Sequence, residues 1–173
     1  MLNYSRLTLL LLSFLCTSAG CSRSQSVEDI ARDQPAETKS QGDDAAIGKV
    51  RAAVHAMTQP QPTVDQVAAE MEGVIMARTR SQALMHYDGY RVTLTTPGDR
   101  VTQVSFQFVE AKPSVRQLNE LFGTSREVRQ GLIYEHQSAV TSSRLMILAE
   151  PVSMPADEDS LIRRIVISGA HRR

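Results

Sequence analysis

Two short stretches of the chain, 62–73 and 113–123, share one order of polar and apolar positions. Each begins with Pro and ends with Gly, and in each a hydroxyl residue stands three positions before a glutamine, which is the arrangement of a capping box at a helix start. The closing residues, Gly73 and Gly123, suit the left-handed conformation that ends a helix. We therefore expect two amphipathic helices, with apolar positions at Val64, Val67, Ala68 and Met71 and at Val115, Leu118, Leu121 and Phe122.

The sequence after each of these helices alternates polar and apolar residues with a period of two, which is typical of strands with one buried face. The alternation is clearest in 101–109, where Val104, Phe106 and Phe108 are separated by polar residues. Asp88 and Gly89 form a tight-turn signal between two such segments. The expected strands are 83–87, 90–95 and 101–109 after the first helix, and 128–137, 143–149 and 161–168 after the second.

The last strand of each half has the same apolar spacing, since Val101, Val104 and Phe106 match Ile162, Ile165 and Ile167. The sequence therefore predicts an α+β fold with two tandem αβββ units, about 62–109 and 113–169. Their strands are expected to form one antiparallel sheet with the helices on one face. The alternative is a single αβββ unit accompanied by a segment that resembles it by chance.

A further helix is predicted ahead of the two units, within a domain of residues 43–173. Asp43 and Asp44 can cap it, and four apolar residues then recur at spacings of three and four until the prolines at 60 and 62 stop the pattern. These four residues are Ile47, Val50, Val54 and Met57. Residues 21–42 contain too few apolar positions to form a buried face, so they are expected to be a flexible tether.

The N-terminus has the organisation of a bacterial signal peptide, which we assign to residues 1–20. Arg6 precedes an apolar run that is too short to cross a membrane as a finished helix, and small residues lead into Cys21. This ending resembles a lipobox, which implies that Cys21 is the lipid attachment site. Such sequences usually carry Leu, Val or Ile where Ser18 stands, so ordinary cleavage near the same place is the alternative. In the Gram-negative lipoproteins that this ending resembles, Ser rather than Asp after the cysteine implies transfer to the outer membrane, so Ser22 leads us to expect the domain on its periplasmic face.

Composition narrows the class of protein. The two cysteines are Cys16, which leaves with the signal peptide, and Cys21, so an acylated mature chain would have neither a disulfide nor a free thiol. The whole chain has 19 basic and 19 acidic residues, and loss of Arg6 leaves 18 basic residues. A chain without a basic stripe is not expected to bind nucleic acid.

The lipobox, the capped helix ending in Leu121-Phe122-Gly123 and the strands after it resemble the small-lipoprotein family of the outer-membrane barrel-assembly machinery. The helix-then-hairpin order is also similar to the tandem-repeat β-lactamase inhibitor proteins. The resemblance covers about residues 62–169. It implies protein binding, either as an accessory of an envelope assembly or as an inhibitor that covers an enzyme's active site with its sheet.

An enzyme or a metal-binding protein is the competing class of function. His86 and His136 each lie thirteen residues after the glycine that closes a helix, so they are candidates for equivalent strand positions and for converging metal ligands. No second ligand follows either histidine at a suitable spacing, so we expect two polar strand residues and no metal site. The acidic run 157–159 lacks the pattern of a calcium loop and is expected to be a solvated connection. We expect no enzyme activity, no cofactor and no small-molecule substrate.

Tyr87, Tyr90 and Arg91 surround the predicted Asp88-Gly89 turn and are the candidate partner-binding residues. The alternative is that the two tyrosines pack at the end of the hairpin. The expected function is that of a membrane-anchored periplasmic lipoprotein that binds an envelope or secreted protein as an accessory subunit of an assembly or secretion complex. The competing hypothesis is an inhibitor or immunity protein that blocks a periplasmic hydrolase or toxin.

Overall fold

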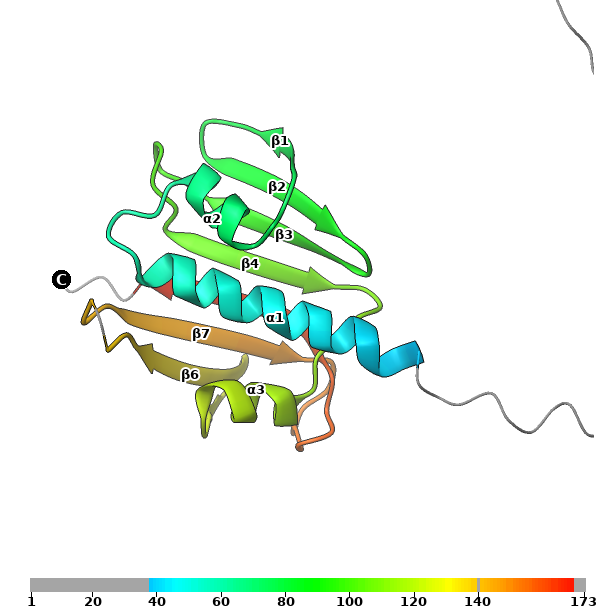
Figure 1. The fold of residues 1–173 in the computed structure, drawn as a ribbon. Helices are drawn as coiled ribbons and strands as arrows, with labels where there is room; N and C mark the ends of the chain where they lie inside the picture. Colours follow the sequence, from blue (N-terminus) through cyan, green and yellow to red (C-terminus); the bar gives the residue numbers. More distant parts are fainter. Residues whose placement is uncertain (1–37, 140, 170–173) are drawn as a thin grey trace, which may run out of the picture. The chain divides into compact units, whose positions relative to one another are not determined.

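The computed structural model describes residues 38–139 and 141–169 (Figure 1). The predicted signal peptide, the lipid attachment site Cys21 and the tether up to residue 37 lie outside the described residues. Among the described helices, none is both long and apolar enough to cross a membrane.

Three helices and eight strands make up the described part of the chain. The first half contains α1 (Thr38–Thr58), α2 (Val64–Glu70), β1 (Ile75–Arg78), β2 (Gln82–Tyr87), β3 (Tyr90–Thr95) and β4 (Gln103–Phe108). The second half contains α3 (Val115–Phe122), β5 (Arg126–Val128), β6 (Gly131–Gln137), β7 (Arg144–Pro151) and β8 (Ile162–Gly169).

The eight strands form one antiparallel sheet in the order β1-β2-β3-β4-β8-β7-β6-β5. The two halves of the chain therefore meet at the centre of the sheet, where β4 pairs with β8. The three helices lie on the same face, with α1 running across the middle of the sheet (Figure 1). The protein is thus an α+β domain with a helix layer on one side of an antiparallel sheet.

Four strands, and not three, follow each of α2 and α3. The additional strands, β1 and β5, are the outermost strands of the sheet and contain four and three residues. Most of their side chains are exposed, so their sequences carry no alternation of buried and exposed residues. This is why the pattern of apolar residues did not predict them.

The two predicted capping boxes are confirmed. The hydroxyl of Thr63 accepts a hydrogen bond from the backbone N–H of Gln66 at 3.3 Å, and Gln66 Oε1 accepts one from Thr63 N–H at 3.0 Å. Ser114 and Gln117 make the same exchange at 3.3 and 2.9 Å. Because each pair satisfies two backbone donors that a helix end leaves unpaired, the sequence defines where α2 and α3 begin.

The helix-ending glycines differ in their roles. Gly123 has a φ of 83° and ends α3 as predicted. The expectation for Gly73 is wrong, because Glu72, with a φ of 48°, takes the left-handed conformation after α2. Gly73 is required for a different reason, since a Cβ there would collide with the hydroxyl of Tyr87 and with Sδ of Met85.

Helix α1 begins at Thr38, inside the segment 21–42 that was assigned to the tether. Of its four predicted apolar residues, Val50, Val54 and Met57 are buried and Ile47 is partly buried. The helix also buries small residues that the pattern did not single out, namely Ala46, Ala53 and Ala56. Small side chains let α1 lie close to the sheet, where it contacts β7 and β8.

The core fills the space between the helix layer and the sheet, and alternate residues of each long strand point into it. Phe106 and Ile165 are fully buried and lie opposite each other on β4 and β8, so their predicted inward orientation is confirmed. Val104 lies opposite Ile167 in the same ladder. The other fully buried large side chains include Met71, Met85, Leu94, Leu118, Tyr134, Leu145, Ile147 and Ile162.

The starts of α2 and α3 are joined to the sheet by equivalent backbone hydrogen bonds. Val101 N–H donates to the carbonyl of Pro62 at 2.7 Å, and Ile162 N–H donates to the carbonyl of Pro113 at 2.8 Å. Each bond links the residue before a helix cap to the chain that enters the last strand of the same half. Both helices are therefore anchored at the same relative place on the sheet.

Candidate binding face

The face of the sheet opposite the helices is called here the open face, because no helix among the described residues covers it (Figure 1). A row of six side chains crosses it from β2 to β6, and each one lies directly opposite the next in the strand pairing. All six are partly exposed. In spatial order they are Leu84, Thr93, Ser105, Val166, Leu148 and Ile133.

The row changes character where the two halves of the sheet meet. Thr93 and Ser105 are polar, whereas Val166, Leu148 and Ile133 are apolar. Met146, which lies opposite Ser168 on β8, adds a side chain that is 45% exposed. We call Ile133, Met146, Leu148 and Val166 the apolar patch. Exposed apolar clusters of this kind mark interaction surfaces more often than single exposed residues do.

Charged residues border the apolar patch on both sides. Arg144 pairs with Glu135 at one end, and this contact holds the pKa of the Glu135 carboxyl below its usual range. At the other end, Glu150 accepts contacts from Arg164 at 3.5 Å and from Arg163 at 3.7 Å. The side chain of Glu150 is only 20% exposed, so two arginines share one recessed carboxylate.

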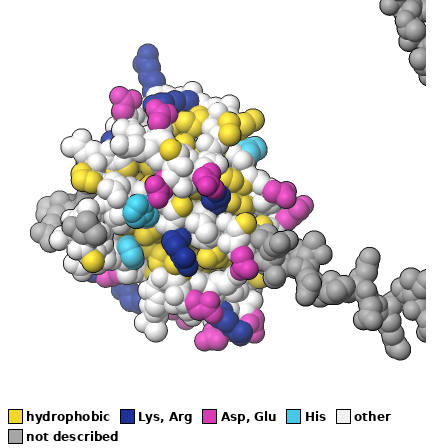
Figure 2. All heavy atoms as spheres, in the orientation of Figure 1, with side chains coloured by type: hydrophobic (Ala, Val, Ile, Leu, Met, Phe, Trp, Pro, Cys, Tyr) yellow, Lys and Arg dark blue, Asp and Glu magenta, His cyan; other side chains and the backbone are white. Residues whose placement is uncertain are grey.

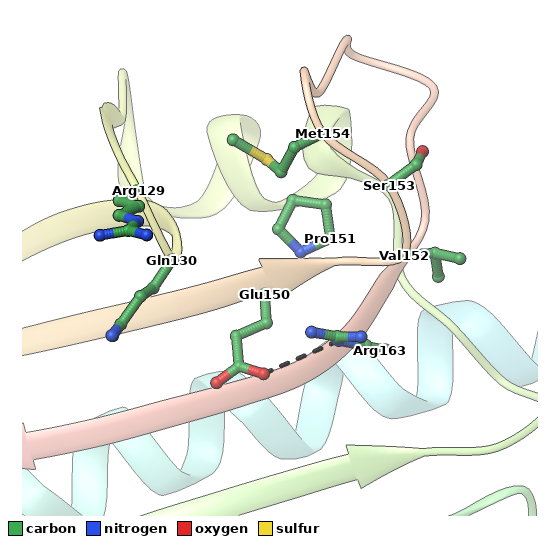
Figure 3. A pocket seen from close by; sticks show the side chains of 8 residues that line it. All are labelled: Arg129, Gln130, Glu150, Pro151, Val152, Ser153, Met154 and Arg163. Atoms are coloured by element: carbon green, nitrogen blue, oxygen red, sulfur yellow. Dashed lines mark ion pairs between the residues drawn. The ribbon is translucent and has the colours of Figure 1, made fainter.

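A cleft of about 440 Å³ opens beside this Glu150 pair, at the corner of the sheet (Figure 3). Figure 3 shows Glu150 and Arg163 on one side of it, joined by their ion pair, and Arg129 on another side. Pro151, Val152 and Met154 add apolar surface, and Gln130 and Ser153 complete the lining. The cleft thus combines arginines with apolar walls.

The three predicted partner-binding residues all border one shallow cleft of about 510 Å³ at the end of the β2–β3 hairpin, but the tyrosines reach it from the helix side of the sheet and Arg91 from the open face. The rings of Tyr87 and Tyr90 stack with centroids 4.9 Å apart on the helix side of the sheet. Tyr90 is 7% exposed and packs against Phe108, and the Tyr87 hydroxyl donates to the carbonyl of Met71 at 3.2 Å. Burial raises the pKa of both phenols. The tyrosines therefore pack against each other at the hairpin end and also line the cleft, so their role in binding a partner stays a prediction.

Arg91, the third predicted residue, points to the open face. Its guanidinium donates to Gln107 Oε1 at 2.6 and 2.9 Å across the β3–β4 ladder. It borders the same cleft as the two tyrosines, together with His86 and Gln107. Arg91 is thus placed to contact a partner, whereas Tyr90 has almost no surface to offer one.

The two strand histidines lie on opposite faces of the sheet, so they cannot converge as metal ligands. His86 pairs with Arg91 on the open face, whereas His136 pairs with Leu145 and contacts the edge of Phe122 on the helix side. Their suggested equivalence is therefore wrong. Among the described residues, no three His, Cys, Asp or Glu side chains gather in a group that could hold a metal ion.

The acidic run 157–159 has a structural role that the sequence did not reveal. Asp159 and Glu158 pair with Arg116 of α3 at 2.8 and 3.7 Å. Asp157 accepts a hydrogen bond from the hydroxyl of Ser160 at 2.6 Å, which lowers the pKa of its carboxyl. The loop therefore holds the start of α3 as well as connecting β7 to β8.

The helix side of the domain shows no concentration of one charge. Acidic and basic side chains are interspersed over the face seen in Figure 2. Several of them form ion pairs within the helix layer or at its border, such as Lys49 with Glu72 at 2.6 Å and Arg78 with Asp65 at 3.4 Å. This mixed surface contrasts with the open face, where apolar residues form a continuous patch.

The comparisons with known proteins give no relative: no protein-family model, no curated protein and no solved structure matches the chain. The open face must therefore be interpreted from its own geometry. Sequence reasoning missed the apolar patch, although a signal was present. Strands β6, β7 and β8 carry apolar residues in both phases of the alternation, at the buried positions and at Ile133, Leu148 and Val166.

Proposed function

We propose that this protein is a lipid-anchored, non-catalytic module that binds another protein through its open face. The observation that carries the proposal is the apolar patch on a sheet face that no described helix covers. Apolar side chains bordered by charged ones are the usual composition of a protein interface, with a core that excludes water and a polar rim. The partner is proposed to be an envelope or secreted protein.

The anchor is proposed to be lipid on Cys21, which places the domain at the periplasmic face of the bacterial outer membrane. The support is the signal-peptide organisation of residues 1–20 and the small residues before Cys21. Buried acyl chains contribute about 0.8 kcal/mol per CH₂, so two or more chains would hold the protein firmly.

We also propose that the two halves are tandem units, each a helix followed by four strands. The matching capping boxes and the matching bonds from Pro62 and Pro113 support this. The central ladder adds an independent argument. If Val104 corresponds to Ile165 and Phe106 to Ile167, exchanging the halves maps the pairs Val104–Ile167 and Phe106–Ile165 onto each other. That self-complementary register is the property of a twofold interface.

An accessory subunit of an assembly or secretion complex is the role we favour, in keeping with the resemblance to the barrel-assembly lipoproteins. A second candidate is an inhibitor or immunity protein that blocks a periplasmic hydrolase or toxin. The uncovered sheet favours this candidate too, because a broad sheet face is the surface with which the similar inhibitor proteins would cover an enzyme. Both functions are non-catalytic and predict the same binding face.

Photo-crosslinking in intact envelopes tests the proposal. A photoreactive residue at Leu148, inside the apolar patch, should yield a discrete protein adduct. The same residue at Arg51, an exposed position of α1, serves as the control and should yield none. Identification of the adduct then distinguishes an assembly component from a hydrolase or toxin. Absence of any adduct at Leu148, or an adduct formed only at Arg51, would contradict binding through the open face.

A further inference from the structure

We infer that the open face selects an acidic protein, whose carboxylates meet a set of arginines around the apolar patch. This inference rests on the proposed function and adds the chemistry of the partner. The argument comes from the distribution of charge. The chain as a whole has equal numbers of acidic and basic residues, 19 of each, but they are not shared equally between the two sides of the sheet.

Arginines outnumber carboxylates on the open face. Strand alternation and pairing place four arginines there, Arg91 on β3, Arg126 on β5, Arg144 on β7 and Arg164 on β8. The corner cleft adds Arg129 and Arg163. Among the described strand residues, the carboxylates on this face are Glu135 and Glu150, and the cleft beside Arg91 adds Asp88 and Glu110, so six arginines stand against four carboxylates. The face is therefore basic although the chain is neutral.

Ion pairs within the domain neutralise only part of this positive charge. Glu135 is paired with Arg144, and Glu150 is shared by Arg163 and Arg164. Within the described part of the chain, Arg126 and Arg129 form no ion pair within 4 Å, although the charge of Arg126 also contributes to the lowered pKa of the Glu135 carboxyl. Both lie at the β5–β6 end of the sheet, next to the apolar patch, because Arg126 is directly opposite Ile133.

The corner cleft is the place where we expect a carboxylate of the partner to bind most tightly. Figure 3 shows Arg129 and Arg163 bordering one hollow, with the single recessed carboxylate of Glu150 between the strands. An acidic side chain entering it would face two guanidinium groups and the apolar surface of Val152 and Met154. Guanidinium groups bind carboxylates with two parallel hydrogen bonds, which favours acidic side chains over neutral ones.

A protein surface fits this face better than an anionic membrane does. Segments that bind membranes usually combine lysines or arginines with Trp, Phe or Leu side chains that protrude into the lipid. The described open-face strand positions contain no Phe, Tyr or Trp residue, and their two leucines, Leu84 and Leu148, are only partly exposed. Val166, Leu148 and Ile133 are only partly exposed, and Met146, at 45%, is the one exposed member of the apolar patch. An apolar centre with an arginine border suits a folded acidic partner.

The first experiment uses a probe of defined chemistry. The full lipidated protein, purified in neutral detergent, is titrated with a fluorescent peptide in which Glu alternates with Leu and Phe. A matched peptide with Gln at every Glu position and vesicles of phosphatidylglycerol are titrated in parallel. We expect the acidic peptide to bind at least about tenfold more tightly than the Gln peptide. Its affinity should fall as the salt concentration is raised, because salt screens the attraction between exposed charges.

Two charge-reversal variants then locate the site. Arg126→Glu with Arg129→Glu changes arginines that form no internal ion pair, so the fold should persist. The control, Arg51→Glu with Arg80→Glu, makes the same change in net charge at exposed positions of α1 and of the β1–β2 turn. We expect the first variant to lose at least about tenfold in peptide affinity and the control to lose less than about twofold. A melting curve for each variant shows that both are folded.

The second experiment tests whether the same arginines are needed to bind the natural partner. The charge-reversal variants are combined with the crosslinker at Leu148 in intact envelopes, and the yield of the adduct is measured. Loss of the adduct in Arg126→Glu/Arg129→Glu and its retention in the control support an acidic partner. An adduct that both variants retain equally overturns the inference and leaves the proposed function intact. Equal affinity for the Gln peptide, or tighter binding of the vesicles than of either peptide, overturns it as well.

Discussion

Ser105 and Val166 lie directly opposite each other on the open face, where the two halves of the sheet join. Beyond Ser105 the next residue of the row is Thr93, and beyond Val166 it is Leu148. The change from polar to apolar side chains at the centre of this row therefore coincides with the β4–β8 ladder, and only its outermost residue on the first half, Leu84, is apolar. If the two halves are tandem units, they have kept the same core but differ on the side that a partner can reach.

This boundary leads to the first prediction. Val166→Thr keeps a β-branched side chain in its strand but adds a hydroxyl to the apolar patch, so it should weaken partner binding more than it weakens the fold. We expect a change in unfolding free energy below about 1 kcal/mol and a clear loss of the Leu148 adduct. Thr93→Ser, in the polar half of the row, is the control. An unchanged adduct with Val166→Thr would show that the patch is not the contact surface.

The second prediction concerns the stability of the core. Phe106→Ala and Ile165→Ala should each cost about 2–5 kcal/mol, because both side chains are fully buried and a truncation leaves a cavity. The two residues are cross-strand neighbours, so the double variant should cost less than the sum of the single ones. Denaturant unfolding measures all three. Gln107→Ala, on the other face of β4, should stay within about 0.5 kcal/mol of the parent.

The third prediction concerns the effect of Gly73→Ala on stability, with Gly48→Ala as its control. Gly73→Ala should destabilise the domain, because the new Cβ would meet the Tyr87 hydroxyl and Met85. Adding Tyr87→Phe removes the hydroxyl and should restore part of the loss. Gly48 lies in α1 with open space around its Cα, so Gly48→Ala should stabilise the helix by about 0.5–1 kcal/mol. A lower melting temperature for Gly73→Ala together with a higher one for Gly48→Ala would verify the close contact at Gly73.

The fourth prediction concerns the anchor. Cys21→Ser removes the only cysteine of the expected mature chain, so the protein should be released from the membrane or remain unprocessed. Fractionation of cells followed by mass measurement distinguishes these forms. A cleaved variant that still sediments with the membrane, and resists high salt, would rule out lipid on Cys21 as the anchor.

The fifth prediction separates surface binding from chemistry at a titrating group. His86→Gln with His136→Gln should keep the fold and change partner affinity by less than about tenfold, or 1.4 kcal/mol. His86 lies on the polar half of the open face and His136 packs beside Phe122, so neither borders the apolar patch. Arg91→Glu is the comparison at the open face. A folded double variant without any binding would direct attention to a histidine-dependent site.

The long strands could be predicted closely from the sequence, because one of their faces is buried against helices. β3 spans the expected residues 90–95, and the inward positions of β4 and β8 follow the alternation. The same reasoning fails at the edges, where β1 and β5 bury little and therefore show no period. Periodicity reports burial, so it detects a strand only where packing selects the side chains.

The error over the histidines has an equally specific cause. Counting thirteen residues from Gly73 and from Gly123 assumes that the two halves have the same register. A β-bulge between Ile75 and Ala77 adds one residue to the β1 ladder. Since strand side chains alternate with a period of two, a shift of one residue moves a side chain to the other face. His86 and His136 are therefore on opposite sides, and no pattern in the sequence marks the bulge.

The candidate site was the least predictable part. Arg91 was recognised as an outward residue, but the apolar patch depends on the spatial order of strands, in which β8 separates β4 from β7. Residues 133, 148 and 166 become neighbours only through that order. Cross-strand neighbours in a sheet of this size come from distant parts of the chain, so the patch emerged only from the fold.

The short outer strands also limit how copies of this protein can associate. β1 has four residues and a bulge, and β5 has three residues, so neither edge of the sheet offers a long, regular row of unpaired backbone groups. Long flat edges are the templates on which sheets of different molecules join into fibres. The apolar patch can thus remain accessible while the ends of the sheet resist edge-to-edge polymerisation, even where many copies crowd together.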